Sequence, residues 1–383
     1  MKRPRFLLCL LPLFALASCI YDFHPEWQGQ EGFVAIEGDI RVGDTCRFDV
    51  RLSTQLDNPQ NVGSPLTYSL RVEAGDGTVY PLRDSIVDLT KADISQEYRL
   101  VVDVTAPFRR TYASSWEPVH ISPPIDSLSW SIEDGGSKLW VNLSTHSDSD
   151  SGFYRWTALE TWEYHATYYA EYFFAPAGTV YKGQTVEQDT FLEYMDGDNT
   201  YYCWRSVPRD DILLGSTQDL SKDRLVDFHL FAFAPEDKRI SYVYSVDLIQ
   251  TRLTEAAYRY WETLNRNSSD VGGLFSAEPV ELRGNLVNVD DADELVLGYV
   301  SVTTCSRWRM FIKNSDTRFS RWHGPSYGFV TPFPDEYRKY YGWGYRVGWM
   351  EEGDFVWLPG ECVDCRRAGG TKDRPSWWIN NDK

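Results

Sequence analysis

The order of apolar and polar positions in the first third of the chain is that of β-strands. In Cys46–Leu52, apolar and polar side chains alternate, which is the two-residue period of a strand with one buried face. The alternation recurs in Tyr68–Val72 and Tyr98–Val104, and Asp76-Gly77 between them is typical of a tight hairpin turn. Strands at this spacing, separated by turn residues, predict an immunoglobulin-like β-sandwich over residues 31–122.

Two consecutive prolines mark the predicted boundary between two domains. Pro123 and Pro124 favour an extended segment and cannot occupy the middle of a sheet. Beyond them the pattern predicts strands at Leu128–Ile132, Leu139–Leu143, Phe153–Trp156, Arg224–Phe233, Ile240–Ile249 and Leu295–Val302. Ser147 to Gly152 is expected to be a hairpin turn. We therefore expect a larger β domain over residues 123–383.

One segment has a helical period instead. Thr254 is a suitable N-cap, and the apolar residues that follow it recur at positions i, i+3, i+4 and i+7. These residues are Ala257, Tyr260, Trp261 and Leu264. They predict an amphipathic helix over residues 254–266 that packs on a sheet.

The last part of the chain lacks a regular period. Residues 314–383 are rich in glycine, proline and aromatic residues, and we expect them to form an irregular C-terminal tail over the second domain. The predicted fold class is mainly β: an N-terminal immunoglobulin-like β-sandwich, then a larger β domain with one packed α-helix and this tail.

The N-terminal residues predict export and lipidation. Lys2, Arg3 and Arg5 precede the apolar run Phe6–Leu16, which is too short to span a bilayer and is typical of a secretory signal peptide. Leu16-Ala17-Ser18-Cys19 has the form of a bacterial lipobox, in which the Cys19 thiol accepts diacylglycerol. We expect residues 1–18 to be the signal peptide, acyl chains such as palmitate on Cys19 to anchor the protein, and residues 19–30 to form a tether.

Composition narrows the classes of partner. The net charge of the 383-residue chain is −18, which disfavours nucleic acid as a partner. Aromatic residues are abundant, with 15 Trp and 24 Tyr, and this surplus has two interpretations. Their rings stack on sugars or other flat ligands, but they also fill β cores, and the second interpretation is favoured.

Five cysteines remain beyond Cys19 in the exported chain. Disulfides are expected in an oxidising compartment, and an odd number leaves one cysteine over, which we expect to be a buried Cys46. The disulfide candidates are Cys203, Cys305, Cys362 and Cys365, and their three possible pairings stay open. A bridge from Cys203 or Cys305 to the tail would pin the tail. The spacing disfavours a Cys₄ zinc site, and a redox role for Cys362 and Cys365 is disfavoured because Gly360 and Asp364 do not suggest the required helix N-terminus after a strand.

Motifs for catalysis and metal binding are weak. Gly324–Gly328 matches the G-x-S-x-G pattern of a nucleophile elbow, but Val330–Pro334 cannot form the helix that the elbow requires. Asp148–Gly152 and Asp290–Glu294 contain possible calcium ligands, although turns and solvated loops explain them better. We expect no catalytic residue, no metal and no cofactor.

Ten short segments occur in the order in which one protein family has them. They are Pro123–Leu128, Phe153–Trp156, Tyr202–Trp204, Ala257–Trp261, Gly272–Pro279, Arg283–Leu286, Leu297–Tyr299, Cys362–Arg366, Gly369–Thr371 and Pro375–Trp378. On these segments the chain resembles the domain of unknown function 4249 family of Bacteroidota lipoproteins, over most of its mature length. One departure is that five residues follow Trp378, where the family often ends near an aromatic residue.

The resemblance implies a location and a partner but no activity. Members of this family are similar in being lipid-anchored outer-membrane proteins, and their genes often lie beside those of TonB-dependent receptors. We therefore expect a non-catalytic accessory or ligand-binding partner of a TonB-dependent uptake receptor, with a glycan or another nutrient as a possible ligand. A glycan-acting hydrolase and a purely structural envelope protein are the alternatives.

Overall fold

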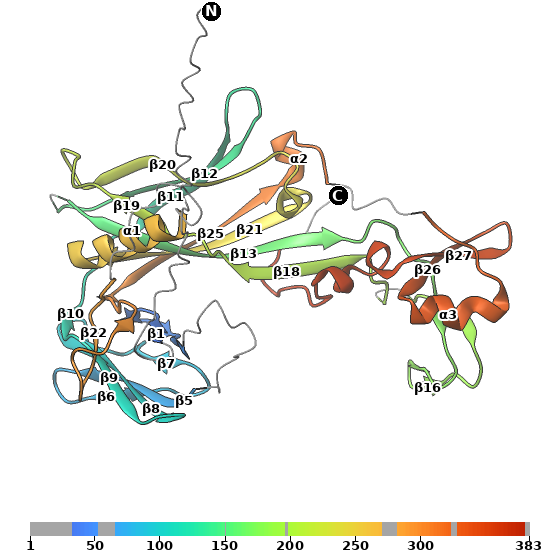
Figure 1. The fold of residues 1–383 in the computed structure, drawn as a ribbon. Coiled ribbons are helices and arrows are strands. Elements are labelled where there is room, and N and C mark those ends of the chain that lie inside the picture. Colours follow the sequence, from blue (N-terminus) through green and yellow to red (C-terminus); the bar gives the residue numbers. More distant parts are fainter. Residues whose placement is uncertain are drawn as a thin grey trace, which may run out of the picture.

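The computed structural model describes residues 33–52, 66–149, 151–195, 198–269, 282–322 and 328–379. These residues form three bodies: an N-terminal sandwich, a second sandwich above it, and an arm that extends from the second sandwich (Figure 1). Most elements are strands, which confirms the mainly β prediction. Within the described residues no helix is both long and apolar enough to cross a bilayer. The predicted signal peptide, Cys19 and the tether lie outside these residues.

The N-terminal sandwich is built from ten short strands of the first third of the chain. Their bounds are β1 (Val34–Glu37), β2 (Ile40–Arg41), β3 (Thr45–Cys46), β4 (Asp49–Leu52), β5 (Thr67–Ala74), β6 (Val79–Pro81), β7 (Val87–Asp88), β8 (Glu97–Ala106), β9 (Arg110–Ser114) and β10 (Glu117–Pro118). Ile36, Val72 and Leu100 are fully buried in its core. The predicted turn at Asp76-Gly77 joins the antiparallel pair β5 and β6, and Gly77 has the positive φ of 90° that such a turn requires.

A segment from late in the chain completes this sandwich. Strand β22 (Leu286–Asn288) pairs with β9, and β23 (Val296–Leu297) and β24 (Val302–Thr303) pair in parallel with β1 and β2. Leu286, Val296 and Val302 belong to the N-terminal core. The predicted domain boundary assigns residues 286–303 to the second domain, but these residues lie in the first. A strand's apolar period gives its buried face but not the sheet that it joins.

The second sandwich has two facing sheets. One has the order β11-β12-β20, and in the other β18-β13-β21-β25 is joined by β19, which pairs with β13. The bounds are β11 (Ile125–Ile132), β12 (Leu139–His146), β13 (Phe153–His165), β18 (Tyr202–Pro208), β19 (Leu213–Ser216), β20 (Arg224–Phe233), β21 (Val243–Leu253) and β25 (Cys305–Lys313). Trp156, Phe233 and Val246 fill the core between the sheets.

Two α-helices and a 3₁₀ helix accompany this sandwich: α1 (Glu255–Ser269), α2 (Asn314–Thr317) and the 3₁₀ helix η1 (Lys238–Ile240). The long helix α1 matches the predicted helix. The hydroxyl of Thr254 accepts a hydrogen bond from the Ala257 N–H at 3.1 Å, as expected of an N-cap. Ala257, Tyr260 and Trp261 are buried against Leu253, so the predicted apolar face is the packed face.

The arm is the part of the structure that differs most from the prediction made from the sequence. It consists of residues 166–201, between β13 and β18, and residues 328–370, which were predicted to be irregular. Its elements are β14 (Tyr172–Ala175), β15 (Val180–Tyr181), β16 (Gln184–Thr185), β17 (Thr190–Glu193), β26 (Tyr345–Glu351), β27 (Asp354–Pro359), α3 (Tyr337–Gly342) and the 3₁₀ helices η2 (Pro334–Glu336), η3 (Gly360–Cys362) and η4 (Cys365–Ala368). The end of the chain returns to the second sandwich, where Thr371 pairs with Trp204 and both Trp377 and Trp378 pack on Phe311.

Candidate functional site

The arm has an interior made largely of aromatic rings. Phe174 of β14 and Trp357 of β27 are buried with ring centroids 5.4 Å apart. Phe191 of β17 stacks on Phe355 at 3.6 Å, and Tyr337 of α3 stacks on Trp357 at 5.6 Å. The two halves of the arm come from distant parts of the chain, and these ring contacts hold them together. Aromatic pairs at such distances add to the free energy of burial, so the arm has a fixed core of its own.

A disulfide ties the two halves of the arm where it joins the second sandwich. It links Cys203 at the start of β18 to Cys365 in η4, and both cysteines are fully buried. Beside the bridge, the Cys365 N–H donates to the Thr200 carbonyl at 2.9 Å. This is one of the pairings that the sequence left open. It attaches the tail to β18, as expected of a bridge from Cys203.

The other two disulfide candidates do not form a bridge. Cys305 begins β25, and its Sγ lies 3.5 Å from Asp44 Oδ2 of the N-terminal sandwich. Cys362 is buried in the arm among Ala170, Val356 and Val363. The predicted second bridge is therefore wrong, because its two cysteines lie in different bodies of the molecule. Burial raises the pKa of both thiols to about 11, so they stay protonated at neutral pH.

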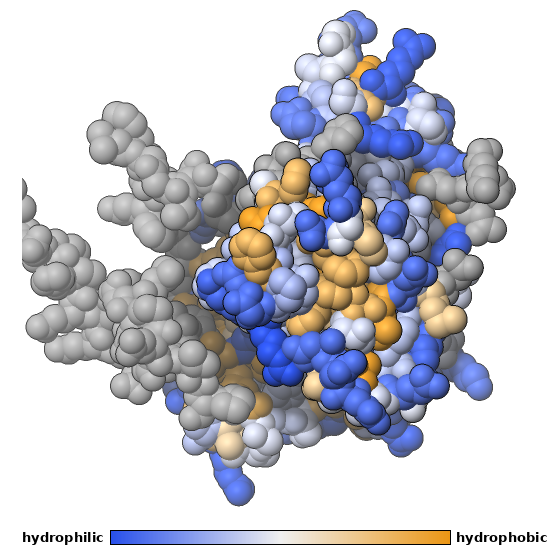
Figure 2. Space-filling model, turned by 90° about the vertical axis from the view of Figure 1, so that its right-hand side faces the viewer, coloured by the Kyte–Doolittle hydropathy of each residue, from blue (hydrophilic) through white to orange (hydrophobic). Residues whose placement is uncertain are grey.

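Large apolar side chains are exposed on the arm. We call these residues the arm surface: Tyr169, Val180, Met195, Phe329, Phe333, Trp343 and Met350. Phe333 is 73% exposed and Trp343 is 63% exposed, which is unusual for rings in a folded protein. Figure 2 looks at the molecule from the arm's side and shows a group of hydrophobic residues in the middle of this face, surrounded by hydrophilic ones. A patch of this kind on a rigid support is typical of a protein interaction site.

The arm is acidic as well as aromatic. Residues 166–201 and 328–370 contain thirteen Asp and Glu but six Lys and Arg, a net charge of −7. Several of these charges are paired: Arg338 donates to both carboxylate oxygens of Asp189, at 2.6 and 2.7 Å. Beside the exposed Trp343 the nearby charge is positive, since Lys339 Nζ lies 4.7 Å from its ring centroid, but the arm as a whole has an excess of carboxylates, which favours a partner with positive charge.

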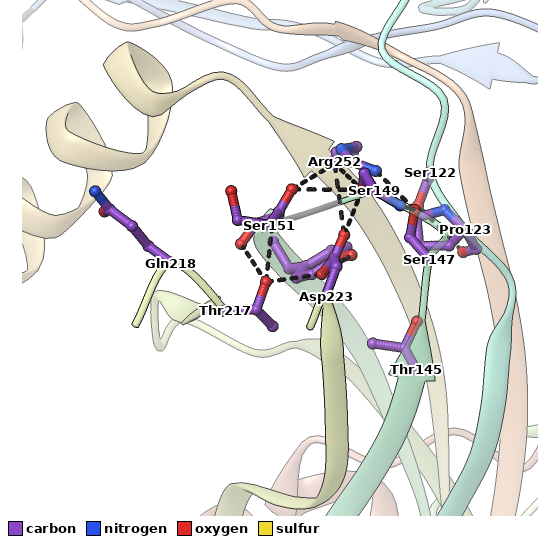
Figure 3. Close-up of polar contacts among 12 residues, drawn as sticks. Ser122, Pro123, Thr145, Ser147, Ser149, Ser151, Thr217, Gln218, Asp223 and Arg252 are labelled. Carbon is purple, nitrogen blue, oxygen red and sulfur yellow. Dashed lines mark hydrogen bonds and ion pairs between the residues drawn. The ribbon is translucent and has the colours of Figure 1, made fainter. Parts of the chain in front are cut away.

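A polar cluster lies at the corner between the two sheets of the second sandwich (Figure 3). Its centre is Asp223, whose side chain is fully buried. Oδ1 accepts hydrogen bonds from Tyr154 and Thr217, each at 2.8 Å. Oδ2 accepts from Ser149 at 2.8 Å and faces the Arg252 guanidinium at 3.5 Å. Both oxygens of the carboxylate are occupied by these contacts, so the role of Asp223 is structural.

The corner corrects the expectation for residues 147–152. They join β12 to β13, which lie in different sheets, so the segment is a crossover and not a hairpin turn. Arg252 donates to the Ser151 carbonyl and the Ser149 hydroxyl, both at 2.8 Å. Gly152 has no room for a side chain, because a Cβ would lie 2.6 Å from the Tyr154 hydroxyl. Ser147, Ser149 and Ser151 of this segment thus bind Arg252 of the protein itself.

The acidic segment 290–294 is also tied into the fold. The buried Glu294 accepts hydrogen bonds from Arg110 at 2.9 Å and from the Tyr112 hydroxyl at 2.8 Å. Across the residues that the structure describes, no group of three or more potential ligands is placed to hold a metal ion. The G-x-S-x-G match lies mostly outside the described residues, as does Asp150.

Sequence reasoning missed the arm as a functional candidate. The aromatic surplus was visible, but which rings are buried and which are exposed depends on how two segments more than a hundred residues apart meet. Val347, Trp357 and Phe174 turn inward, whereas Phe333 and Trp343 do not. Proline and glycine in residues 328–370 hid the strand pattern there.

Comparison with known proteins gives a family and no function. A search of curated proteins found no match. The model of a family described as "Domain of unknown function (DUF4249)" matches residues 20–308, which is well over half of the chain. The match covers the N-terminal sandwich, most of the second sandwich as far as the middle of β25, and the first half of the arm. The chain therefore belongs to the domain of unknown function 4249 family.

Proposed function

We propose that this protein is a lipid-anchored accessory protein of the outer membrane, without catalysis of its own, that docks on a partner through the arm surface. The observation that carries the proposal is the exposure of Phe333 and Trp343 on an arm with its own aromatic core. Aromatic side chains supply much of the binding energy at protein interfaces, especially where their support is already rigid.

Charge narrows the choice of partner. An arm with a net charge of −7 on a chain with a net charge of −18 repels a second copy of itself and anionic lipid. The complementary surface is an apolar patch on a protein, bordered by Lys and Arg.

We infer that the partner is a TonB-dependent receptor in the same membrane. This choice rests on the family resemblance, and the predicted lipid on Cys19 supports it physically. Two proteins held in one membrane meet at a high effective concentration, so a modest docking surface is sufficient for a stable pair.

The test is affinity purification of the full-length protein from membranes of its native host. The wild-type protein should retain a TonB-dependent receptor that mass spectrometry identifies. The double variant Phe333→Ser with Trp343→Ser should retain about 30-fold less, because the loss of an interface ring costs about 2 kcal/mol or more.

The matched control removes exposed apolar side chains from the N-terminal sandwich. Val79 is 50% exposed and Ile94 is 57% exposed, and Val79→Ser with Ile94→Ser should retain the receptor as the wild-type protein does. Equal retention by both double variants would show that the arm surface is not the docking site. A wild-type protein that stays monomeric after chemical crosslinking would overturn the proposal as a whole.

A further inference from the structure

Most cations of the arm gather at one place, although the arm as a whole is acidic. Four of its six Lys and Arg lie around η4, near the disulfide, together with a lysine that follows the arm in sequence. We call these five residues the basic corner: Lys182, Arg346, Arg366, Arg367 and Lys372. The basic corner shares no residue with the arm surface.

Two arginines of the basic corner lie side by side at the turn between α3 and β26. Arg346 donates hydrogen bonds to the carbonyls of Tyr341 and Tyr345, at 3.1 and 2.6 Å. The Arg367 side chain packs on the same turn, since a Cβ on Gly344 would lie 3.7 Å from its Nη1. Burial, and after it the positive charge of Arg367, lower the pKa of Arg346. Among the described residues, neither arginine has a carboxylate within ion-pair distance, so the fold holds two like charges next to each other.

The other three cations of the corner are accompanied by two carboxylates. Arg366 pairs with Asp364 at 2.8 Å, and Lys182 pairs with Asp198 at 2.7 Å. Lys372 lies within electrostatic reach of both ion pairs. Five cations and two carboxylates leave an excess of three positive charges.

The excess remains when the charges next to the corner are counted. Glu361 and Asp373 lie in the same stretch of chain. Arg205 adjoins it through a hydrogen bond to the Ala368 carbonyl at 3.2 Å. With these three included, six cations still exceed four carboxylates by two. Screening in physiological salt acts over about 8 Å, so the neighbouring charges outweigh the distant carboxylates of this acidic chain.

The excess charge and the two adjoining guanidinium groups together select the kind of anion. A carboxylate has a single charge, whereas a phosphate monoester has a charge of about −2 and three terminal oxygens. Each guanidinium donates hydrogen bonds in a planar fork that matches two phosphate oxygens. A phosphate monoester therefore matches both the charge and the donors of this place.

We propose that the basic corner binds the phosphate group of a phosphate monoester. Arg346 and Arg367 donate hydrogen bonds to its oxygens, and Lys372 adds positive charge. The group can belong to a lipid or to a soluble ester, and the experiment separates these two sources. This inference does not depend on the docking role of the arm.

The experiment is isothermal titration calorimetry of the full-length protein in nanodiscs of uncharged lipid, at constant ionic strength. The probes are inorganic phosphate, dihexanoyl phosphatidic acid below its micelle concentration, and acetate. Inorganic phosphate should bind with a dissociation constant of about 1 mM or below, and acetate about tenfold more weakly. Tighter binding of the phosphatidic acid than of phosphate would assign the group to a lipid, and equal binding of the two would assign it to a soluble ester.

The variants test whether the two arginines form the site. Arg346→Gln with Arg367→Gln should weaken phosphate binding about tenfold or more. Because Arg346 also holds the turn after α3, the single variant Arg367→Gln is measured too and should weaken binding about fivefold.

The matched control is Lys222→Gln with Arg224→Gln, which removes the same charge from exposed residues of the second sandwich. It should bind phosphate as the wild-type protein does. An equal loss in the control, equal affinity for phosphate and acetate, or no binding of phosphate would each overturn the proposal. Receptor retention is a separate readout, so failure here leaves the docking proposal in place.

Discussion

The buried carboxylate of Asp223 stabilises the segment in which the chain passes from one sheet of the second sandwich to the other. The chain leaves one sheet at His146 and enters the other at Phe153. Backbone hydrogen bonds hold the two ends of this crossover, from the Ser147 N–H to the Asp223 carbonyl at 2.9 Å and from the Thr217 N–H to the Gly152 carbonyl at 3.0 Å. The Asp223 side chain adds contacts to Tyr154, Thr217 and Ser149. A buried acid with this many donors is stabilising only while every partner is present.

Replacing Asp223 with alanine should lower the free energy of unfolding by about 3–5 kcal/mol. The substitution leaves the buried Tyr154 hydroxyl without its acceptor, removes one partner of Thr217, and leaves Arg252 without its counter-ion. Urea denaturation monitored by tryptophan fluorescence measures the change. Asp219→Ala, at an exposed position of the same loop, is the control and should stay within about 0.5 kcal/mol of the wild-type protein. A similar small effect for Asp223→Ala would mean that the cluster does not hold the corner.

At the scale of elements, the arm depends on contacts between segments that are remote in sequence. The disulfide closes a loop of 162 residues, between β18 and the 3₁₀ helix η4. The hydrogen bond from the Glu171 N–H to the Gly348 carbonyl, at 2.6 Å, joins the same two halves further out. Either half alone would expose the rings that they bury together.

The double variant Cys203→Ser with Cys365→Ser should loosen the arm while the sandwiches remain folded. The chain-entropy model gives about 5 kcal/mol for a closed loop of this length, and the segment that gains the freedom is the arm. Hydrogen exchange read by mass spectrometry should show faster exchange in residues 345–359 and unchanged exchange in β13 and β21.

The control for this variant is Cys305→Ser, which leaves the bridge intact. It should match the wild-type protein throughout the arm. Uniformly faster exchange across both sandwiches in the double variant would show instead that the bridge stabilises the whole molecule and not the arm in particular.

At the scale of the whole molecule, the two sandwiches are linked more tightly than their order along the chain indicates. Val300 and Val302 are fully buried in the N-terminal core, although about 180 residues separate them from the end of the first third of the chain. An ion pair also joins the bodies, since Arg155 of β13 lies 3.1 Å from Asp39 of the N-terminal sandwich. The N-terminal sandwich is therefore incomplete without residues 286–303.

A fragment of residues 31–122 should consequently fail to fold by itself. It lacks β22, β23 and β24, and with them Leu286, Val296 and Val302 of its core. Its amide NMR spectrum should have the narrow dispersion of an unfolded chain. Adding a synthetic peptide of residues 282–305 should restore dispersion, whereas a scrambled peptide should not. A well-dispersed spectrum of the fragment alone would contradict the interdependence seen in the structure.

The sequence was sufficient for those features that depend on local pattern. The turn at Asp76-Gly77 and the helix after Thr254 use short-range rules, and the structure has both of them. The predicted strand Cys46–Leu52 is right only in part, because Arg47 and Phe48 separate β3 from β4, which join different sheets. The sequence was insufficient where residues far apart meet, as in the return of residues 286–303 and the pairing of Cys203 with Cys365. The arm surface also belongs to this class, because exposure is a property of the assembled chain.

The late completion of the N-terminal sandwich has a consequence for how the protein reaches its place. The predicted signal peptide would export the chain across the inner membrane from its N-terminus, and a chain exported in this way must stay unfolded while it crosses. Here the first hundred residues emerge without the strands β23 and β24 that close their core, and those strands follow only after some two hundred more residues. The order of the strands thus delays the folding of the N-terminal sandwich, so the part nearest the predicted anchor is among the last to become compact.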